Sequence, residues 1–255
     1  MEFTISPSPS PAIVLSLYDR KRFPKFQALF EPTEKDGMWR LLVQPPEEAG
    51  RAVVVENQST KDLTALRCRW VMTTATGKTT EHTSSSDSYQ ADIYHPVLKP
   101  QDRKLICFST AVDESFLDHL AQGGGGFAIG GGRRQLPSGT TSLRLEIEML
   151  LFADGELAGA QTDKYALELQ CRKPAAEFIA KQIRLAEAEN RDITPVLSAL
   201  NEMPYLRDDI LAHWVRRYAS YYLTHSSDEQ KRAALRHLEN RPALPEFYRR
   251  ENSKD

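Results

Sequence analysis

The segment of this sequence that most resembles a functional motif, a phosphate-binding loop, is two glycine runs followed by two arginines. Gly123–Gly126 and Gly130–Gly132 precede Arg133 and Arg134. A glycine-rich loop can hold a phosphate, but the spacing excludes both standard motifs. No GxGxxG repeat is completed, and no GxxxxGK sequence is followed by Ser or Thr. We therefore predict a long loop at residues 123–132, with Arg133 and Arg134 at its base as candidate contacts for a partner.

The histidines do not form a metal-binding pattern. The sequence contains no HExxH and no HxH, and His213 and His225 are too far apart to bind one metal from a single helical face. We interpret them as surface or packing residues, and the sequence predicts neither a metal nor a cofactor.

A polar and aromatic patch follows a run of serines. It comprises Asp87, Tyr89, Asp92, Tyr94 and His95. Aspartate and histidine can act as general acid and base. However, no nucleophile stands at a diagnostic spacing, and the serines Ser84–Ser86 lack a GxSxG elbow. The patch is therefore interpreted as an ordinary polar segment.

The three cysteines, Cys68, Cys107 and Cys171, include no CxxC pair. This sparse, odd set favours packed free thiols over a disulfide framework, although one bridge between Cys68 and Cys107 is left open.

An aromatic-rich segment near the end of the chain has two interpretations. Trp214, Tyr218 and Tyr222 recur at helical spacing and are typical of a packing face. Clustered Trp and Tyr also suit a partner-binding face, and Tyr221 lies off the stripe, where we expect it to be exposed. Trp214 and Tyr221 are therefore further candidate partner contacts.

Composition narrows the class of protein. The chain has 255 residues, with 33 Lys and Arg against 35 Asp and Glu. Because the basic residues are interleaved with acidic ones, no nucleic-acid partner is expected. No apolar run approaches the roughly 20 residues that a membrane span needs. The compartment is left open between the cytoplasm and export after removal of a leader, because residues 1–11 form a Pro/Ser-rich leader or linker.

Short extended runs broken by turn residues follow this segment. Bulky residues alternate with arginines over 63–73 and with charged residues over 143–151, which predicts strands with one buried face. Gly77 and the Asp154-Gly155 pair indicate hairpin turns. The remaining predicted strands are 12–18, 38–43, 52–55 and 104–111.

The run Val53–Ser59, the strand Leu66–Met72 and the turn Phe152–Gly155 together resemble an immunoglobulin-like β-sandwich of uncharacterised bacterial proteins. The resemblance covers about residues 55–170. It implies a sandwich fold and a cell-envelope setting, and it implies no activity because this fold hosts many functions.

The apolar rhythm changes near residue 160 to one of every third or fourth residue. Thr194-Pro195 and the capping pattern at 226–229 indicate helix starts, and Pro174 is expected to break or kink whatever spans it. The segment 161–172 fits a helix or a strand. We predict an α+β chain, in which an antiparallel immunoglobulin-like sandwich at 12–160 precedes three or four helices at 161–248 and a frayed tail at 249–255.

These observations favour a non-catalytic binding or interaction module, whose partner is another protein. Two alternatives are kept. One is an enzyme with a cleft at the junction of sandwich and helices, where His95, His213 or Asp209 would provide polar groups. The other is a structural subunit of a cell-envelope assembly.

Overall fold

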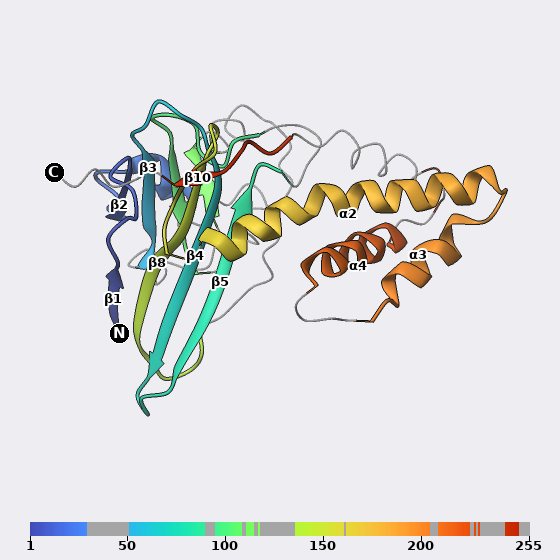
Figure 1. Cartoon of the computed structure of the whole chain (residues 1–255). Helices are drawn as coiled ribbons and strands as arrows, with labels where there is room; N and C mark the ends of the chain where they lie inside the picture. Colours follow the sequence, from blue (N-terminus) through green and yellow to red (C-terminus); the bar gives the residue numbers. More distant parts are fainter. Residues whose placement is uncertain are drawn as a thin grey trace. The chain divides into compact units, whose positions relative to one another are not determined.

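The computed structural model describes residues 1–29, 51–89, 95–108, 111–114, 117, 136–160, 162–204, 209–224, 227, 229 and 243–249. The chain is α+β, with strands first and helices after them (Figure 1). It divides into two compact units. The first contains residues 1–86, 96–153 and 157–160, and the second contains 87–95, 154–156 and 161–255.

The larger sheet of the first unit is built around two long antiparallel strands, β4 (Leu63–Thr74) and β8 (Thr140–Phe152). Figure 1 shows them side by side, with β5 (Thr79–Asp87) beyond β4. On the other edge of β8, β1 (Glu2–Ile5) pairs in parallel and β9 (Glu156–Ala158) pairs antiparallel. The sheet therefore runs in the order β9-β8-β4-β5.

The smaller sheet has the order β2-β3-β6-β7, with every pair antiparallel. Its strands are β2 (Ile13–Leu17), β3 (Val53–Asn57), β6 (Arg103–Ile106) and β7 (Ala111–Asp113). A short 3-10 helix, η1 (Pro24–Leu29), follows β2. The β-branched residues of β3 explain its place inside this sheet, because such side chains suit a strand that is buried on both faces.

One hydrophobic core is shared by the two sheets of the first unit, and a second, smaller cluster around Phe26 and Val54 covers the other face of the smaller sheet. Val53 and Val55 from the smaller sheet share this core with Trp70 and Leu145 from the larger one. The Trp70 ring is fully buried, stacked on Phe3. The early strands thus bury the alternating faces that their sequence period indicated.

One expectation about β8 was wrong beyond Ile147. A strict period of two would place Met149 and Leu151 on the same face as Ile147. The pairing register instead shifts by one residue where Arg67 faces Met149 and Cys68 faces Ile147. This β-bulge at Glu148 reverses the alternation, because the extra residue moves the following side chains to the opposite face. Leu150 and Phe152 join the core instead.

Both predicted hairpin turns are present. Gly77 and Gly155 have positive φ angles of 78° and 94°. At Gly77 a Cβ atom would meet open space, whereas at Gly155 it would lie 1.9 Å from the carbonyl oxygen of Glu246. Close approach of backbone, in addition to φ, therefore requires glycine at position 155.

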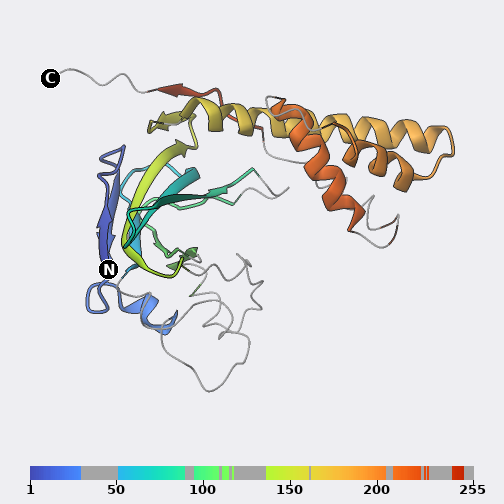
Figure 2. The ribbon, with the colours of Figure 1, turned by 90° about the horizontal axis from the view of Figure 1, so that it is seen from below.

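Three helices form the second unit in the described part of the chain, together with the short strand β10 (Tyr248–Arg249). They are α2 (Thr162–Ala188), α3 (Ile193–Asn201) and α4 (Ile210–Leu223). Figures 1 and 2 show α3 and α4 along one side of α2. Asp192 and Asp209 cap α3 and α4 by accepting hydrogen bonds from backbone N–H groups.

These helices resolve several expectations. The segment 161–172, which the sequence left between helix and strand, is helical from Thr162 onward. Pro174 was expected to break or kink whatever spans it. It lies inside α2 without ending it, so the helix is not broken there, and the kink stays a prediction. The predicted strand 38–43 and nearly all of the helix expected after residue 226 lie outside the described residues, as does the tail beyond residue 249.

Candidate functional site

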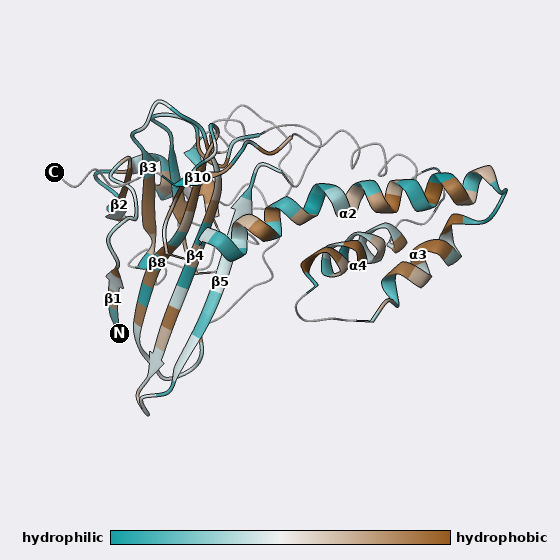
Figure 3. Ribbon diagram, in the orientation of Figure 1, coloured by the Kyte–Doolittle hydropathy of each residue, from teal (hydrophilic) through white to brown (hydrophobic). Residues whose placement is uncertain are grey.

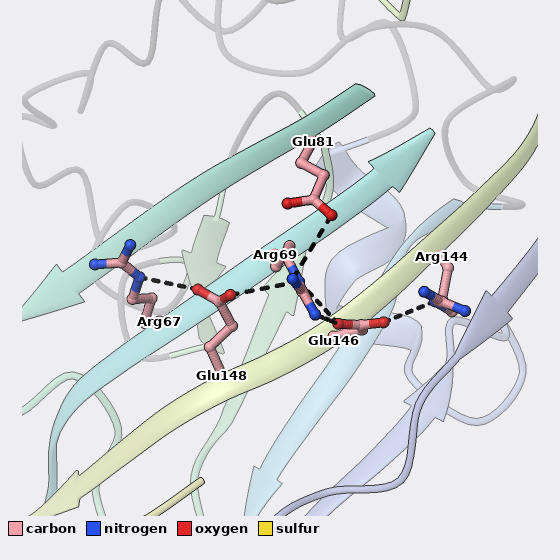
Figure 4. Close-up of polar contacts among 6 residues, drawn as sticks. All are labelled: Arg67, Arg69, Glu81, Arg144, Glu146 and Glu148. Atoms are coloured by element: carbon pink, nitrogen blue, oxygen red, sulfur yellow. Dashed lines mark hydrogen bonds and ion pairs between the residues drawn. The ribbon is translucent and has the colours of Figure 1, made fainter. Parts of the chain in front are cut away.

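A line of ion pairs crosses the face of the larger sheet that is turned away from the core (Figure 4). Arg67 Nε donates to Glu148 Oε2 at 2.9 Å. Arg69 Nε donates to Glu146 Oε2 at 2.9 Å, and its Nη1 lies 3.6 Å from Glu81 Oε1. These side chains come from β4, β8 and β5, so the network ties the three strands together.

The charges within the network balance. Its third arginine, Arg144, has its Nε 2.7 Å from Glu146 Oε1, so three arginines face three glutamates and little net charge is left for a ligand. The hydrogen bond with Glu146 raises the pKa of Arg69, so the charged form is favoured within the pair. We interpret these ion pairs as a structural feature that stabilises the pairing of the three strands.

A second polar cluster lies on the smaller sheet. Arg103 Nε donates to Glu56 Oε2 at 2.7 Å. This hydrogen bond, with a second one from Gln58, lowers the pKa of Glu56 below the usual glutamate value. Asn57 stabilises the following turn, because its amide donates to the carbonyl oxygens of Lys61 and Leu98.

The helical unit contains a buried charge pair. The guanidinium of Arg172 donates to Asp87 Oδ2, and the two side chains are 5% and 0% exposed. Tyr165 OH donates to the same oxygen at 3.4 Å, and the backbone N–H of Tyr89 donates to Oδ1 at 3.1 Å. Burial is the largest single effect and opposes the charge on Arg172. The attraction to Asp87 and Tyr165, the hydrogen bond to Asp87 and the nearby Tyr218 together outweigh it, so the pKa of Arg172 is raised.

Trp214 lies in the core of this unit. The guanidinium carbons of Arg172 and Arg217 are 4.3 and 4.8 Å from its ring centroid, and Tyr218 packs beside it. Trp214 is only 6% exposed. Of its two interpretations, packing describes its environment, and it is not an exposed anchor. Tyr221 is 57% exposed, as expected, and its role as a contact stays a prediction.

The remaining residues that the sequence singled out do not lie with Trp214 and Tyr221 in one described site. Arg133, Arg134 and the loop 123–132 lie outside the described residues, as do Asp92 and Tyr94 of the polar patch. Asp87 and Tyr89 belong to the buried cluster around Arg172, and His95 is exposed. Asp209 caps α4, and the His213 ring lies edge-on to Trp214.

Two of the three cysteines are buried, and all three are free. Burial raises the pKa of the Cys68 thiol to about 12, so its reactive thiolate is scarce. Burial and then the nearby Asp209 carboxylate raise the pKa of Cys171, which is partly exposed. The bridge that was left open between Cys68 and Cys107 is not formed.

An exposed apolar stripe on α2 was missed by sequence reasoning. Leu167, Phe178 and Leu185 are 47%, 40% and 45% exposed. They are separated by 11 and 7 residues, so they lie within about 20° of one line along the helix. Pro174 is exposed at an intermediate heptad step. The 3.5-residue spacing was a readable signal, but it was hidden by the stronger apolar pattern of the buried face.

Exposed apolar side chains concentrate in the helical unit. Of the large hydrophobic side chains exposed in the described part of the chain, only Met1 and Leu17 belong to the first unit. Those of the second unit are Leu167, Phe178, Leu185, Leu211, Tyr221 and Tyr248.

No group of three or more His, Cys, Asp or Glu residues suited to a metal occurs among the residues that the structure describes. None of the helices in that part of the chain combines the length and hydropathy that crossing a membrane requires. Comparison with protein-family models, with curated proteins and with solved structures finds no match.

Proposed function

We propose that the chain is a non-catalytic protein-binding module, whose helical unit contacts the partner. The observation that carries this proposal is the exposed stripe of Leu167, Phe178 and Leu185 on α2. The ion pairs on the larger sheet support it indirectly, because Arg67, Arg69 and Arg144 are engaged with Glu81, Glu146 and Glu148.

The stripe suits an amphipathic helix of another protein. Leu167 and Leu185 are 18 residues apart, which is five turns or about 27 Å of helix. Pro174 and Phe178 lie between them, at steps of seven, four and seven residues. A partner helix with apolar residues at heptad positions can follow such a line over its whole length. The occupant is therefore a helix, rather than an extended peptide or a small ligand.

The first unit is proposed to be an immunoglobulin-like scaffold. In that fold one sheet contains strands A, B and E, and the other contains G, F and C, to which variable-type domains add C′. The orders β2-β3-β6 and β9-β8-β4-β5 agree with these sequences. The buried Trp70 on β4 agrees with the tryptophan of strand C. Two features depart from this fold. β7 follows β6 in the chain although strand D precedes strand E, and β1 pairs in parallel with β8, the strand that corresponds to F.

Site-specific photo-crosslinking in the native cells tests the binding proposal. A photoreactive residue at position 178 is compared with one at Glu187, which is exposed and lies nine residues, or half a turn in orientation, from Phe178. We expect one protein to crosslink from positions 167, 178 and 185, through apolar positions of one helix, and not from 187.

The variant Phe178→Lys should reduce that crosslink from position 185 at least tenfold, whereas Glu187→Lys should not change it. Far-UV circular dichroism confirms that both variants stay folded. Equal crosslinking from 178 and 187, or crosslinks that map to loops of many unrelated proteins, would overturn the proposal.

A further inference from the structure

We propose that two copies of this chain associate through β5, whose outer edges pair antiparallel to make one continuous sheet. β5 is the last strand of the order β9-β8-β4-β5 among the described residues. The proposal goes beyond the helix-binding function, because it concerns a different unit and a different chemistry.

The composition of β5 is unusual for an edge that must stay single. Natural edges are protected by charged side chains, above all Lys, by Pro, by bulges, by covering segments or by extreme shortness. The two carboxylates of β5 are already paired, Glu81 with Arg69 and Asp87 with Arg172. The nine residues Thr79–Asp87 include neither Lys nor Pro. Five of the nine are exposed, and the strand is more hydrophilic than β4 and β8 (Figure 3). A polar edge strand of this length can pair with a second strand, and it exposes no aggregation-prone apolar surface while the chain is single.

The hairpin fixes which backbone groups of β5 point to the outer edge. The Thr74 N–H donates to the Lys78 carbonyl oxygen at 3.0 Å, so Lys78 is directed toward β4. In an antiparallel pair the direction alternates along the strand. The outward groups are therefore those of Thr79, Glu81, Thr83 and Ser85. The ion pair from Glu81 to Arg69 places the Glu81 side chain on the face of the sheet turned away from the core, and the side chains of Thr79, Thr83 and Ser85 share that face by the period of two.

When two β5 strands pair antiparallel with Thr83 opposite Thr83, the side chains of one copy are compatible with those of the other. In that register Glu81 faces Ser85 of the second copy, and Thr80 faces Ser86. The pairing ends before Asp87, whose side chain is buried against Arg172. No two like charges are opposite each other, and most of the remaining pairs join hydroxyl residues. Opposed Thr and Ser side chains form hydrogen bonds that stabilise an antiparallel ladder.

The first test is the solution mass of the full chain by sedimentation over a concentration series. We expect a shift toward twice the chain mass of 28.9 kDa. Thr83→Pro removes an outward N–H and should return the mass to that of one chain, whereas Thr83→Val keeps the N–H and should leave the dimer intact. A chain that stays monomeric at all concentrations, or a dimer that Thr83→Pro leaves unchanged, would overturn the proposal.

A crosslink keeps the proposal testable if Thr83→Pro does not fold. In a Cys171→Ser background, Thr83→Cys should form a disulfide between copies, because Thr83 faces itself across the pair with Cα atoms about 5.5 Å apart. Glu81→Cys is the matched control, since its two copies would be four residues, or about 13 Å, out of register. A disulfide from Glu81→Cys and none from Thr83→Cys would contradict this pairing.

Discussion

The buried pair of Asp87 and Arg172 gives the sharpest prediction about stability. Asp87→Asn keeps the size of the side chain and removes its charge, leaving the Arg172 guanidinium without its counterion at a position only 5% exposed. Removing one member of a buried pair costs about 3–5 kcal/mol, because an uncompensated charge remains in the protein interior. A total stability of roughly 5–15 kcal/mol makes this a large fraction of the whole.

The loss of unfolding free energy caused by Asp87→Asn should depend on whether the charged Arg172 side chain remains. Arg172→Met fills the space with an apolar chain, and the double variant Asp87→Asn with Arg172→Met removes both charges. We expect the double variant to be at least about 2 kcal/mol more stable than Asp87→Asn alone, because no charge is left buried without a partner.

Urea unfolding followed by far-UV circular dichroism measures these differences. Glu189→Gln is the matched control, since it breaks the pair with Arg191, in which both side chains are more than half exposed. It should change the unfolding free energy by less than about 1 kcal/mol. A loss below about 1 kcal/mol for Asp87→Asn, or a double variant less stable than either single one, would refute the reasoning.

Two further predictions concern titrating groups. In the native protein a thiol reagent should modify Cys171 first, and Cys68 should react only on unfolding, because burial raises its pKa to about 12; mass spectrometry of labelled peptides measures this, and equal rates at the two sites would contradict it. The Arg103 hydrogen bond lowers the folded pKa of Glu56, so its stabilisation is present above the unfolded glutamate value of about 4.3 and is lost as pH falls through the folded pKa. Glu56→Gln should therefore be less stable than the natural chain near neutral pH and equally stable at strongly acidic pH in urea melts; a difference that does not change with pH would contradict this origin.

Much of the fold was readable because local rules agree with it. Alternation over 63–73 and the glycines at 77 and 155 led to the correct strands and turns. The alternation of β8 failed at Glu148, because a bulge is set by pairing with β4 and leaves no mark in the residues of one strand.

The candidate site was less readable. Asp87 and Arg172 are 85 residues apart in the chain, so no local pattern could pair them. For Trp214 the difficulty was different. An apolar stripe on a helix does not by itself show whether that face is buried within the chain or exposed to a partner. The stripe on α2 had a readable spacing, but its exposure depends on how α3 and α4 cover the opposite face.

The most direct measurement of the binding function is the ratio of photo-crosslink yields from positions 178 and 187 of α2. If the stripe binds a partner helix, one protein should crosslink at least tenfold more from position 178. A ratio near one, with both probes folded into the helix, would contradict it.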